Sequence, residues 1–409
     1  MSVLVINSGS SSIKYQLVDT KTETAIAHGL AEQIGSEHGR IVHHFAGGNT
    51  ELNMPIPDHE VGLRRILELF EEVGPDLRRS HVRAVGHRVV QGGRYFSSAA
   101  IIDDEVLELI EELIPLGPLH NPANLKGIQV AMSLLDVPHV AVFDTAFFHS
   151  LPREAAIYAL NRKVADKYRI RRYGAHGTSH QYVSRKVAEL MGRDDLRQIV
   201  LHLGNGASAS AVVGDRAIDT SMGLTPLEGL MMGTRTGDID PAVVFHLARE
   251  AGMTIDQLDD LFNKESGMKG LSGDSDMRLV WKRAESGDQD AIEAIDVYVH
   301  RVVSYIGAYT AQMGGLDALT FTAGIGERDI PMRQLICERL EPFGVLLDYS
   351  ANQAKPKEPR VISHPDSVVR VMVVPTNEEL EIAKQSIELV MSKQHGKEGR
   401  LRELSFRED

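Results

Sequence analysis

The stretch Leu4–Asp19, LVINSGSSSIKYQLVD, joins an aliphatic run, a turn of serine and glycine, and a second strand-like run. Residues 2–7 predict a short buried strand, and Ile13–Asp19 predicts the strand that returns beside it. The stretch Val200–Asp215, VLHLGNGASASAVVGD, repeats this order of strand, small-residue turn and returning strand. We therefore expect an α/β chain of two related halves, although two unrelated β-hairpins would give the same local pattern.

Other periodic segments predict the elements around these two hairpins. Helices are expected at 58–73, 103–114, 121–135 and 288–313, and strands at 137–144, 198–203, 208–213, 317–322 and 368–374. Asp58 is the expected N-cap of the first helix, and Asn121 that of the third. Thr376–Glu379 fits a capping box that opens a last helix to about Ser392, followed by a charged tail.

Composition excludes several classes of protein. With 409 residues, 43% of them hydrophobic and 25% charged, the chain reads as a soluble globular protein of two domains. Its one cysteine, Cys337, allows neither an internal disulfide nor a four-cysteine metal site. No apolar run has the length of a membrane span, and the N-terminus lacks the pattern of a secretory signal. We therefore expect a cytoplasmic protein with no membrane partner.

The net charge and the absence of several common motifs exclude further classes of function. The net charge of −13 disfavours nucleic acid as a partner. The sequence contains no P-loop, no dinucleotide fingerprint, no H-E-x-x-H and no G-x-S-x-G. His176 and His180 are four residues apart in HGTSH, but no glutamate lies between them, which argues against a zinc site.

Three glycine-rich turns suggest that the chain binds a nucleotide. Asn7–Ser12 with Lys14 offers backbone N–H groups, hydroxyls and a positive charge, which can hold phosphate oxygens. His202–Gly206 is the matching turn of the second half, and Thr322–Glu327 follows a third strand. Each alone would be a plain turn, but together they favour a clamp around a nucleotide.

Five side chains are candidates for the chemistry. Arg88 and Arg235 lie between glycines, in expected turns where a guanidinium could bind carboxylate or phosphate; the alternative is a surface ion pair. Asp144, at the end of a buried strand, could position a reacting group or cap a helix. His176 is either structural or a donor to a charged transition state. Glu378 either favours the dipole of the helix that it opens or binds Mg²⁺.

Taken together, the chain closely resembles the acetate kinase family. The segments that carry the resemblance run in order from residue 3 to about 383: VLVINSGSSSIKY, GHRVVQGG, PLHNPAN, VFDTAFF, YGAHGTSH, HLGNGAS, DTSMGLTPLEGLMMGTRTGDIDP, FTAGIGE and PTNEEL. The resemblance implies two related domains of the actin, sugar kinase and Hsp70 ATPase fold with a cleft between them. The expected domains are residues 1–146 plus 380–409, and the nucleotide-binding 147–379. It also implies a homodimer.

The activity that the resemblance implies is reversible, direct in-line transfer of the γ-phosphoryl group of ATP to acetate, giving acetyl phosphate and ADP. The implied cofactor is Mg²⁺, with Mn²⁺ as a substitute. A propionate kinase of the same family is the alternative, and a filament protein or chaperone on the same fold is the rival from another class. Pyrophosphate could replace ATP, but Gly324 and Ile325 leave the third turn open for adenine, which favours ATP.

The resemblance also implies roles for individual residues. Those expected at Mg²⁺ are Asn7 and Glu378; the catalytic ones are Asp144, His176 and Arg235. Those expected at acetate are Arg88, Val90, Leu119, Ala175 and Pro226. Those expected at ATP are Ser10, Ser12, Lys14, His202, Leu203, Gly204, Asn205, Gly206, Asp276, Met277, Arg278, Gly324, Ile325, Gly326, Glu327 and Arg328.

Three of these residues depart from the family pattern. Met277 stands where phenylalanine is frequent, Arg328 where asparagine is frequent, and Ala175 where phenylalanine is frequent. An alanine in the acetate pocket leaves room for one more methylene, so we expect propionate to be used within about tenfold of acetate. A neighbouring side chain that fills the space is the alternative.

Overall fold

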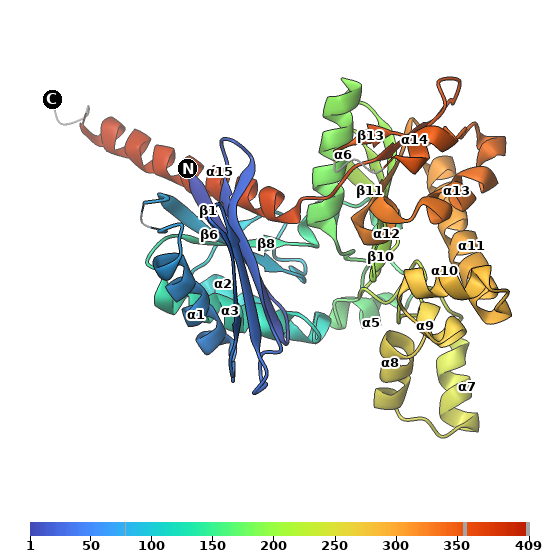
Figure 1. Ribbon diagram of the computed structural model, residues 1–409, viewed down its shortest axis with the longest axis horizontal. Helices are drawn as coiled ribbons and strands as arrows, with labels where there is room; N and C mark the ends of the chain where they lie inside the picture. The colour runs from blue at the N-terminus through green and yellow to red at the C-terminus, as the bar shows by residue number, and fades with distance from the viewer. Residues whose placement is uncertain (78, 355–357, 406–409) are drawn as a thin grey trace. The chain divides into compact units, whose positions relative to one another are not determined.

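The computed structural model describes residues 1–77, 79–354 and 358–405, and the chain forms two compact units (Figure 1). Unit 1 contains Met1–His149 and the chain from Asn377 onward, and unit 2 contains Ser150–Thr376. The sequence places these changes at 146/147 and 379/380, three residues away in each case. The difference matters for Glu378, which belongs to unit 1 and not to the second domain.

The sheet of unit 1 has strand order β5-β4-β3-β2-β1-β6-β8-β7. Strands β1 to β5 pair antiparallel in sequence, β6 and β8 continue parallel to β1, and β7 closes the edge antiparallel. The bounds are β1 (Ser2–Ser8), β2 (Ser12–Asp19), β3 (Thr24–Glu32), β4 (Arg40–Phe45), β5 (Gly48–Asn53), β6 (Val82–Val89), β7 (Ala100–Ile101) and β8 (His139–Phe143).

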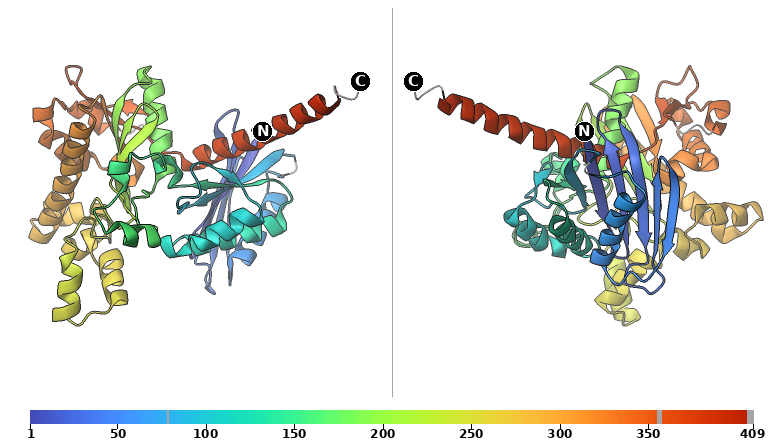
Figure 2. Two further views of the ribbon diagram at one scale, coloured as in Figure 1. Left: turned by 180° about the vertical axis from the view of Figure 1, so that it is seen from behind. Right: turned by 60° about the vertical axis from the view of Figure 1, so that its left-hand side comes forward.

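Helices cover both faces of this sheet (Figures 1 and 2). They are α1 (His59–Glu72), α2 (Asp104–Glu112), α3 (Asn121–Leu134) and α15 (Glu378–Ser405), with 3₁₀ turns η1 (Ile114–Leu116) and η2 (Ala146–Phe148). On one face, Leu4 and Ile6 of β1 pack in a core with α1 and α3. The opposite face contacts α15, which approaches so closely that a Cβ at Gly86 would lie 2.7 Å from the side chain of Ile382. Glycine at this position therefore lets the last helix cover the sheet.

Unit 2 has a second sheet, of order β11-β10-β9-β12-β14-β13. Its strands are β9 (Arg197–Leu203), β10 (Ala207–Val213), β11 (Arg216–Thr220), β12 (Ala318–Thr322), β13 (Arg360–Val361) and β14 (Arg370–Val373). Three antiparallel strands, β11-β10-β9, are followed by the parallel pair β12 and β14, as β3-β2-β1 are followed by β6 and β8. The repeated hairpins therefore occupy equivalent positions in the two sheets, and the prediction of an α/β chain with two related halves is confirmed.

The helices of unit 2 also lie on both faces of its sheet. They are α4 (Arg153–Ala156), α5 (Arg162–Lys167), α6 (Gly177–Met191), α7 (Ala242–Glu250), α8 (Ile255–Lys264), α9 (Gly267–Ser272), α10 (Met277–Glu285), α11 (Gln289–Gln312), α12 (Ala323–Arg328), α13 (Ile330–Arg339), α14 (Tyr349–Gln353) and the 3₁₀ turn η3 (Glu341–Phe343). Ile199 and Leu201 of β9 pack with α11, whereas Val200 between them packs with α6. This alternation is what a strand buried on both faces produces.

Helix ends show where local patterns mislead. Asp58 is the N-cap of α1, as predicted, and accepts a hydrogen bond from the amide of Val61. Asn121 is instead the first residue of α3, preceded by His120. The last helix begins one residue later than the capping box predicts, because Asn377 accepts the hydrogen bond from the amide of Leu380. It also continues past Ser392 to the end of the described residues, and residues 406–409 of the predicted tail lie outside them.

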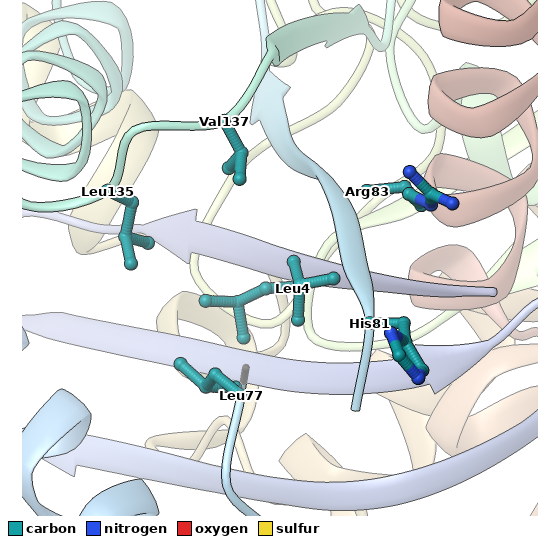
Figure 3. A pocket seen from close by; sticks show the side chains of 7 residues that line it. Leu4, Leu77, His81, Arg83, Leu135 and Val137 are labelled. Atoms are coloured by element: carbon teal, nitrogen blue, oxygen red, sulfur yellow. The ribbon is translucent and has the colours of Figure 1, made fainter. Parts of the chain in front are cut away.

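Two further observations concern surfaces away from the candidate site. A cavity of about 330 Å³ opens in unit 1 where β6 begins, with Leu4, Leu77, Leu135 and Val137 on its aliphatic side (Figure 3). Arg88 lies at the other end of β6, so this cavity is separate from the groups described next. Within the described residues, no helix combines the length and apolar character needed to cross a bilayer.

Candidate active site

Arg88 and Asp144 form a buried ion pair at the carboxyl ends of two parallel strands. Arg88 lies in β6, and Asp144 directly follows β8, where its amide donates to the carbonyl of Val89 at 2.9 Å. The Nε and Nη2 atoms of Arg88 donate to the carboxylate at 2.7–3.2 Å. The Asp144 side chain is 0% exposed and that of Arg88 is 21% exposed. The pair lies at the sheet edge where ligands of α/β proteins bind.

These positions correct two sequence-based expectations. Arg88 is on a regular strand and not in a glycine-flanked turn, although the glycines that follow at 92 and 93 do leave the strand. Asp144 does not cap a helix, since the 3₁₀ turn η2 begins after Thr145 without any side-chain cap. Its carboxylate is used to bind Arg88.

Glu378 adds a second, half-buried carboxylate to this part of unit 1. Burial raises the pKa of Glu378; Arg88 lowers it and Asp144 raises it. For Arg88, burial would lower the pKa, but the charges of Asp144 and Glu378 outweigh burial and raise it. The three groups are therefore coupled electrostatically, with two negative charges around one guanidinium. With both carboxylates ionised, such a set carries an excess negative charge that a cation can neutralise.

The first glycine turn lies at the end of β1 in the same unit. Asn7 is opposite Lys14 in the β1–β2 hairpin, and the turn is closed by a hydrogen bond from the amide of Gly9 to the carbonyl of Ser12. Ser10 is exposed, and Ser12 is half-buried. Lys14 forms an ion pair with Glu379, the neighbour of Glu378 at the start of α15. The turn has the donors that the phosphate hypothesis requires.

Two asparagines that the sequence analysis did not assign to the site hold the segment after Arg88. Asn124 accepts from the amide of Val90 at 3.2 Å and donates to the carbonyl of Ser8 at 2.8 Å. Asn121 exchanges two hydrogen bonds of 3.0 Å with the backbone of Gln91. Both belong to the PLHNPAN segment, and the resemblance of that segment to the family was the signal that could have indicated them. They connect the ends of β1 and β6.

In unit 2, His176 and Arg235 converge on the second glycine turn. A Cβ at Gly206 would lie 3.5 Å from the ring of His176 and 3.8 Å from Nη1 of Arg235. His176 has the left-handed backbone conformation, with φ 58° and ψ 22°, immediately before α6. This conformation is costly for a residue other than glycine and is concentrated at functional sites. The ring of His202 stacks on that of His176 with centroids 4.2 Å apart.

Arg235 differs from Arg88 in its surroundings. Its Nη1 donates to the carbonyl of Pro226 at 3.0 Å, and burial lowers its pKa. Over the described ranges, no carboxylate forms an ion pair with this guanidinium. A partly buried cation held by neutral groups is suited to receive an anion.

The residues expected around the acetate methyl group are divided between the units. In unit 1, Val90 is buried and Leu119 is 51% exposed. In unit 2, Pro226 is half-buried, whereas Ala175 is 2% exposed and packs in the main core cluster. Ala175 therefore has close neighbours, as the alternative of a filled space requires.

A cavity of about 880 Å³ in unit 2 is lined by half of the residues expected at the nucleotide. Of the predicted set, those that line it are Gly204, Asn205, Asp276, Met277, Arg278, Gly324, Ile325 and Arg328. Its lining also includes residues that the sequence did not indicate: Ser275, Trp281, Glu285, Asp329, Ile330 and Pro331. The Trp281 indole donates to Asp329 at 2.7 Å, which fixes one wall. The volume suits a drug-sized ligand.

The third glycine turn is a short helix and not a turn. Thr322–Glu327 crosses from β12 into α12, whose Gly324 and Ile325 face the cavity. Glu327 does not line the cavity; it accepts from the amides of Ala323 and Thr376. Gly326 is buried, and its carbonyl accepts from the buried Arg333 at 3.0 Å. These two residues support the cavity wall from behind.

Comparisons with known proteins extend over nearly the whole chain. The model of the Acetokinase family matches residues 2–384. Curated proteins named acetate kinase from Streptomyces griseus and Leifsonia xyli are 55% and 56% identical, each over 95% of this chain and over 96% and 98% of their own lengths.

Solved structures give the same result. Acetate kinase from Porphyromonas gingivalis has a TM-score of 0.90 and 41% identity. A propionate kinase from Francisella tularensis has a TM-score of 0.90 and 39% identity. Both comparisons cover 95% of this chain and 99% of the other.

Proposed function

The chain belongs to the acetokinase family and is a kinase, and from this premise we propose that it transfers the γ-phosphoryl group of ATP reversibly to acetate, forming acetyl phosphate and ADP. The observation that carries the proposal is the family match over residues 2–384, which extends into both units and includes every candidate residue. The Arg88–Asp144 pair, the His176–Arg235 pair and the 880 Å³ cavity are the local features in its favour.

In this proposal, the protein's own residues position the reactants and neutralise charge. Arg88 binds the acetate carboxylate, while Arg235 and His176 donate to the oxygens of the phosphoryl group as it moves. The acetate oxygen attacks phosphorus in line with the leaving oxygen of ADP. Acetate is already deprotonated at neutral pH, since carboxyl groups titrate near pH 4, so no general base is required. Asp144, with its carboxylate bound to Arg88, then orients that guanidinium.

The donors of unit 1 fit Mg²⁺ as the cofactor. Mg²⁺ prefers one or two carboxylates, several waters and the substrate phosphates to an all-protein cage. Asn7 and Glu378 offer an amide oxygen and a carboxylate, and the described residues contain no cluster of three or more acidic, histidine or cysteine ligands. When bound, Mg²⁺ neutralises phosphate charge; Mn²⁺ accepts the same oxygen donors. A homodimer remains part of the proposal by family resemblance, and a cytoplasmic location remains part of it by composition.

The test is formation of acyl phosphate, trapped as the hydroxamate. We expect product with acetate, ATP and Mg²⁺, none with pyrophosphate, and the reverse reaction with ADP. Propionate and butyrate belong in the same assay, because a propionate kinase is among the structural relatives and Ala175 departs from the family pattern. A kcat/KM for propionate above that for acetate would assign the chain to propionate, and no product with any of the three acids would refute both assignments.

Gly324 gives a separate test of the nucleotide cavity. It lines the cavity, and a Cβ built there meets no atom within 4 Å, so Gly324→Leu should fold normally while filling space that ATP needs. We expect KM for ATP to rise at least about tenfold with Tm nearly unchanged. The matched control is Gly307→Leu on α11, another helical glycine whose added Cβ meets nothing within 4 Å and which lies outside this cavity. Equal KM values in both variants would place ATP elsewhere.

A further inference from the structure

A chain of hydrogen bonds extends from His176 into the core of unit 2. Nδ1 of His176 is 2.9 Å from the hydroxyl of Ser208. The same hydroxyl is 2.7 Å from Nε2 of His180, and Nδ1 of His180 is 2.7 Å from the hydroxyl of Ser210. Ser208, His180 and Ser210 are all 0% exposed. The chain therefore ends in a dry interior, where every buried polar hydrogen needs an acceptor.

The protonation state of His180 limits this chain to two arrangements. Burial lowers the pKa of His180 far below its usual value, with a smaller effect from His202, so the ring is neutral. A neutral imidazole has one N–H donor and one bare nitrogen. The hydroxyl of Ser208 has one hydrogen, so it donates to one of its two histidines and accepts from the other. All hydrogen bonds from His176 to Ser210 must therefore be donated in the same direction along the series.

Ser210 decides between the two directions. Its hydroxyl has one hydrogen, and among the described residues its hydrogen-bond partner is Nδ1 of His180. If each hydrogen bond were donated toward Ser210, the hydroxyl hydrogen of Ser210 would be buried without an acceptor, which costs about 1–3 kcal/mol. When the hydrogen bonds are donated away from Ser210, the hydroxyls of Ser210 and Ser208 and the Nε2–H of His180 each have an acceptor. His180 then carries its hydrogen on Nε2 and donates to Ser208.

We propose that Ser210, His180 and Ser208 fix the tautomer of His176. In the favoured direction, Ser208 donates to Nδ1 of His176, so a neutral His176 must carry its hydrogen on Nε2. That edge of the ring faces Gly206, the position shared with Arg235. His176 is thereby prepared to donate a hydrogen bond to an anion at the turn. His180 does not touch the reacting atoms and is a positioning residue.

A second short chain holds the neighbouring ring. Nδ1 of His202 is 2.8 Å from the hydroxyl of Ser179, which is 2.8 Å from the hydroxyl of Thr376. Because His202 stacks on His176, this chain limits the tilt of the His176 ring. The hydrogen bonds from Ser210 through His180 and Ser208 then determine which nitrogen of His176 carries the hydrogen. The stacked ring of His202 determines the direction in which that N–H points.

The test reads the tautomer of His176 by nitrogen-15 NMR on the whole histidine-labelled protein without substrates, above pH 8, where free imidazole is neutral. The His176 signals are assigned by their loss in His176→Asn. We expect hydrogen on Nε2 in the wild type and a mixture of tautomers in Ser208→Ala. Ser184→Ala, a buried hydroxyl on the same helix that donates to the carbonyl of Gln181, should leave the tautomer unchanged. Hydrogen on Nδ1 or on both nitrogens in the wild type, or an unchanged tautomer in Ser208→Ala, would overturn the proposal.

Kinetics supply the second readout. The effect on transfer rests on the proposed function, but the tautomer is measured without any reaction, so the two can fail separately. We expect Ser210→Ala to lower kcat about tenfold while KM for ATP stays within about twofold, because the donor matters most in the transition state. His180→Gln, which retains an N–H near the Nε2 position, should keep more of kcat than His180→Leu at equal Tm. Equal kcat in these two variants would contradict a positioning role.

Discussion

Replacing Arg235 with alanine is expected to lower kcat by about 10²–10³-fold while leaving Tm almost unchanged. Loss of a donor that stabilises developing charge typically has an effect of this size. Stability should survive because the guanidinium bonds to the Pro226 carbonyl and to no carboxylate of the described residues, so its removal leaves no buried charge unpaired. Arg235→Lys should also be nearly inactive, because an ammonium group cannot form two parallel bonds to a phosphoryl group.

The measurement is kcat for acyl phosphate formation beside a thermal melt of each variant. Arg216→Ala is the matched control, since this arginine is exposed on β11 of the same unit. It should retain wild-type kcat. An Arg235→Ala protein that is folded and reacts at a near-normal rate would remove Arg235 from the reaction.

Arg88→Ala should lose both activity and stability, which distinguishes it from Arg235→Ala. The carboxylate of Asp144 is 0% exposed and would lose the hydrogen bonds and the positive charge of Arg88. Breaking a buried ion pair from one side typically costs about 3–5 kcal/mol of unfolding free energy. From the sequence alone we would expect little loss of fold at both arginines; the buried partner changes that expectation for Arg88.

The double variant Arg88→Ala/Asp144→Asn separates the two roles of Arg88. Neutralising Asp144 should restore much of the unfolding free energy, measured by urea denaturation, because the buried side chain no longer carries a charge. Activity should stay low, since acetate has lost its guanidinium. If the double variant regained kcat/KM for acetate together with stability, Arg88 would be only a structural partner of Asp144.

The sequence could predict the fold because each half repeats a pattern that needs only neighbours along the chain. Aliphatic runs broken by Gly9 and by Gly204–Gly206 predict hairpins without knowledge of their partners, and the strands β1, β2, β9 and β10 formed where expected. The errors occurred where a local motif competes with a tertiary partner. Thr376 has the residue type of an N-cap, but its hydroxyl bonds to Ser179, and the cap moves to Asn377. The side chain of Asn121 likewise does not cap its helix, because its Oδ1 accepts a hydrogen bond from the amide of Gln91.

For the candidate site, the residues that carry the chemistry were easier to predict than the neighbouring side chains that position them. Arg88 and Asp144 are 56 positions apart, and only the parallel pairing of β6 with β8 brings them together. Ser208 and Ser210 look like small residues of an ordinary strand, and their value to His176 depends on His180 lying under both. Glycine-rich sequence at 323–326 predicted a turn, but the end of β12 and the bond from Arg333 to Gly326 stabilise a short helix.

The division of unit 1 into two stretches of sequence has a consequence for biosynthesis. Residues up to His149 leave the ribosome before unit 2 is made, while α15 is translated only after Thr376. Until then, the face of the first sheet around Gly86 and Val5 lacks its covering helix. Nascent chains with apolar sheet surface exposed are prone to aggregate and are typical clients of chaperones. Synthesis of α15, and not emergence of the first sheet, is then the event that allows this half of the molecule to complete its core.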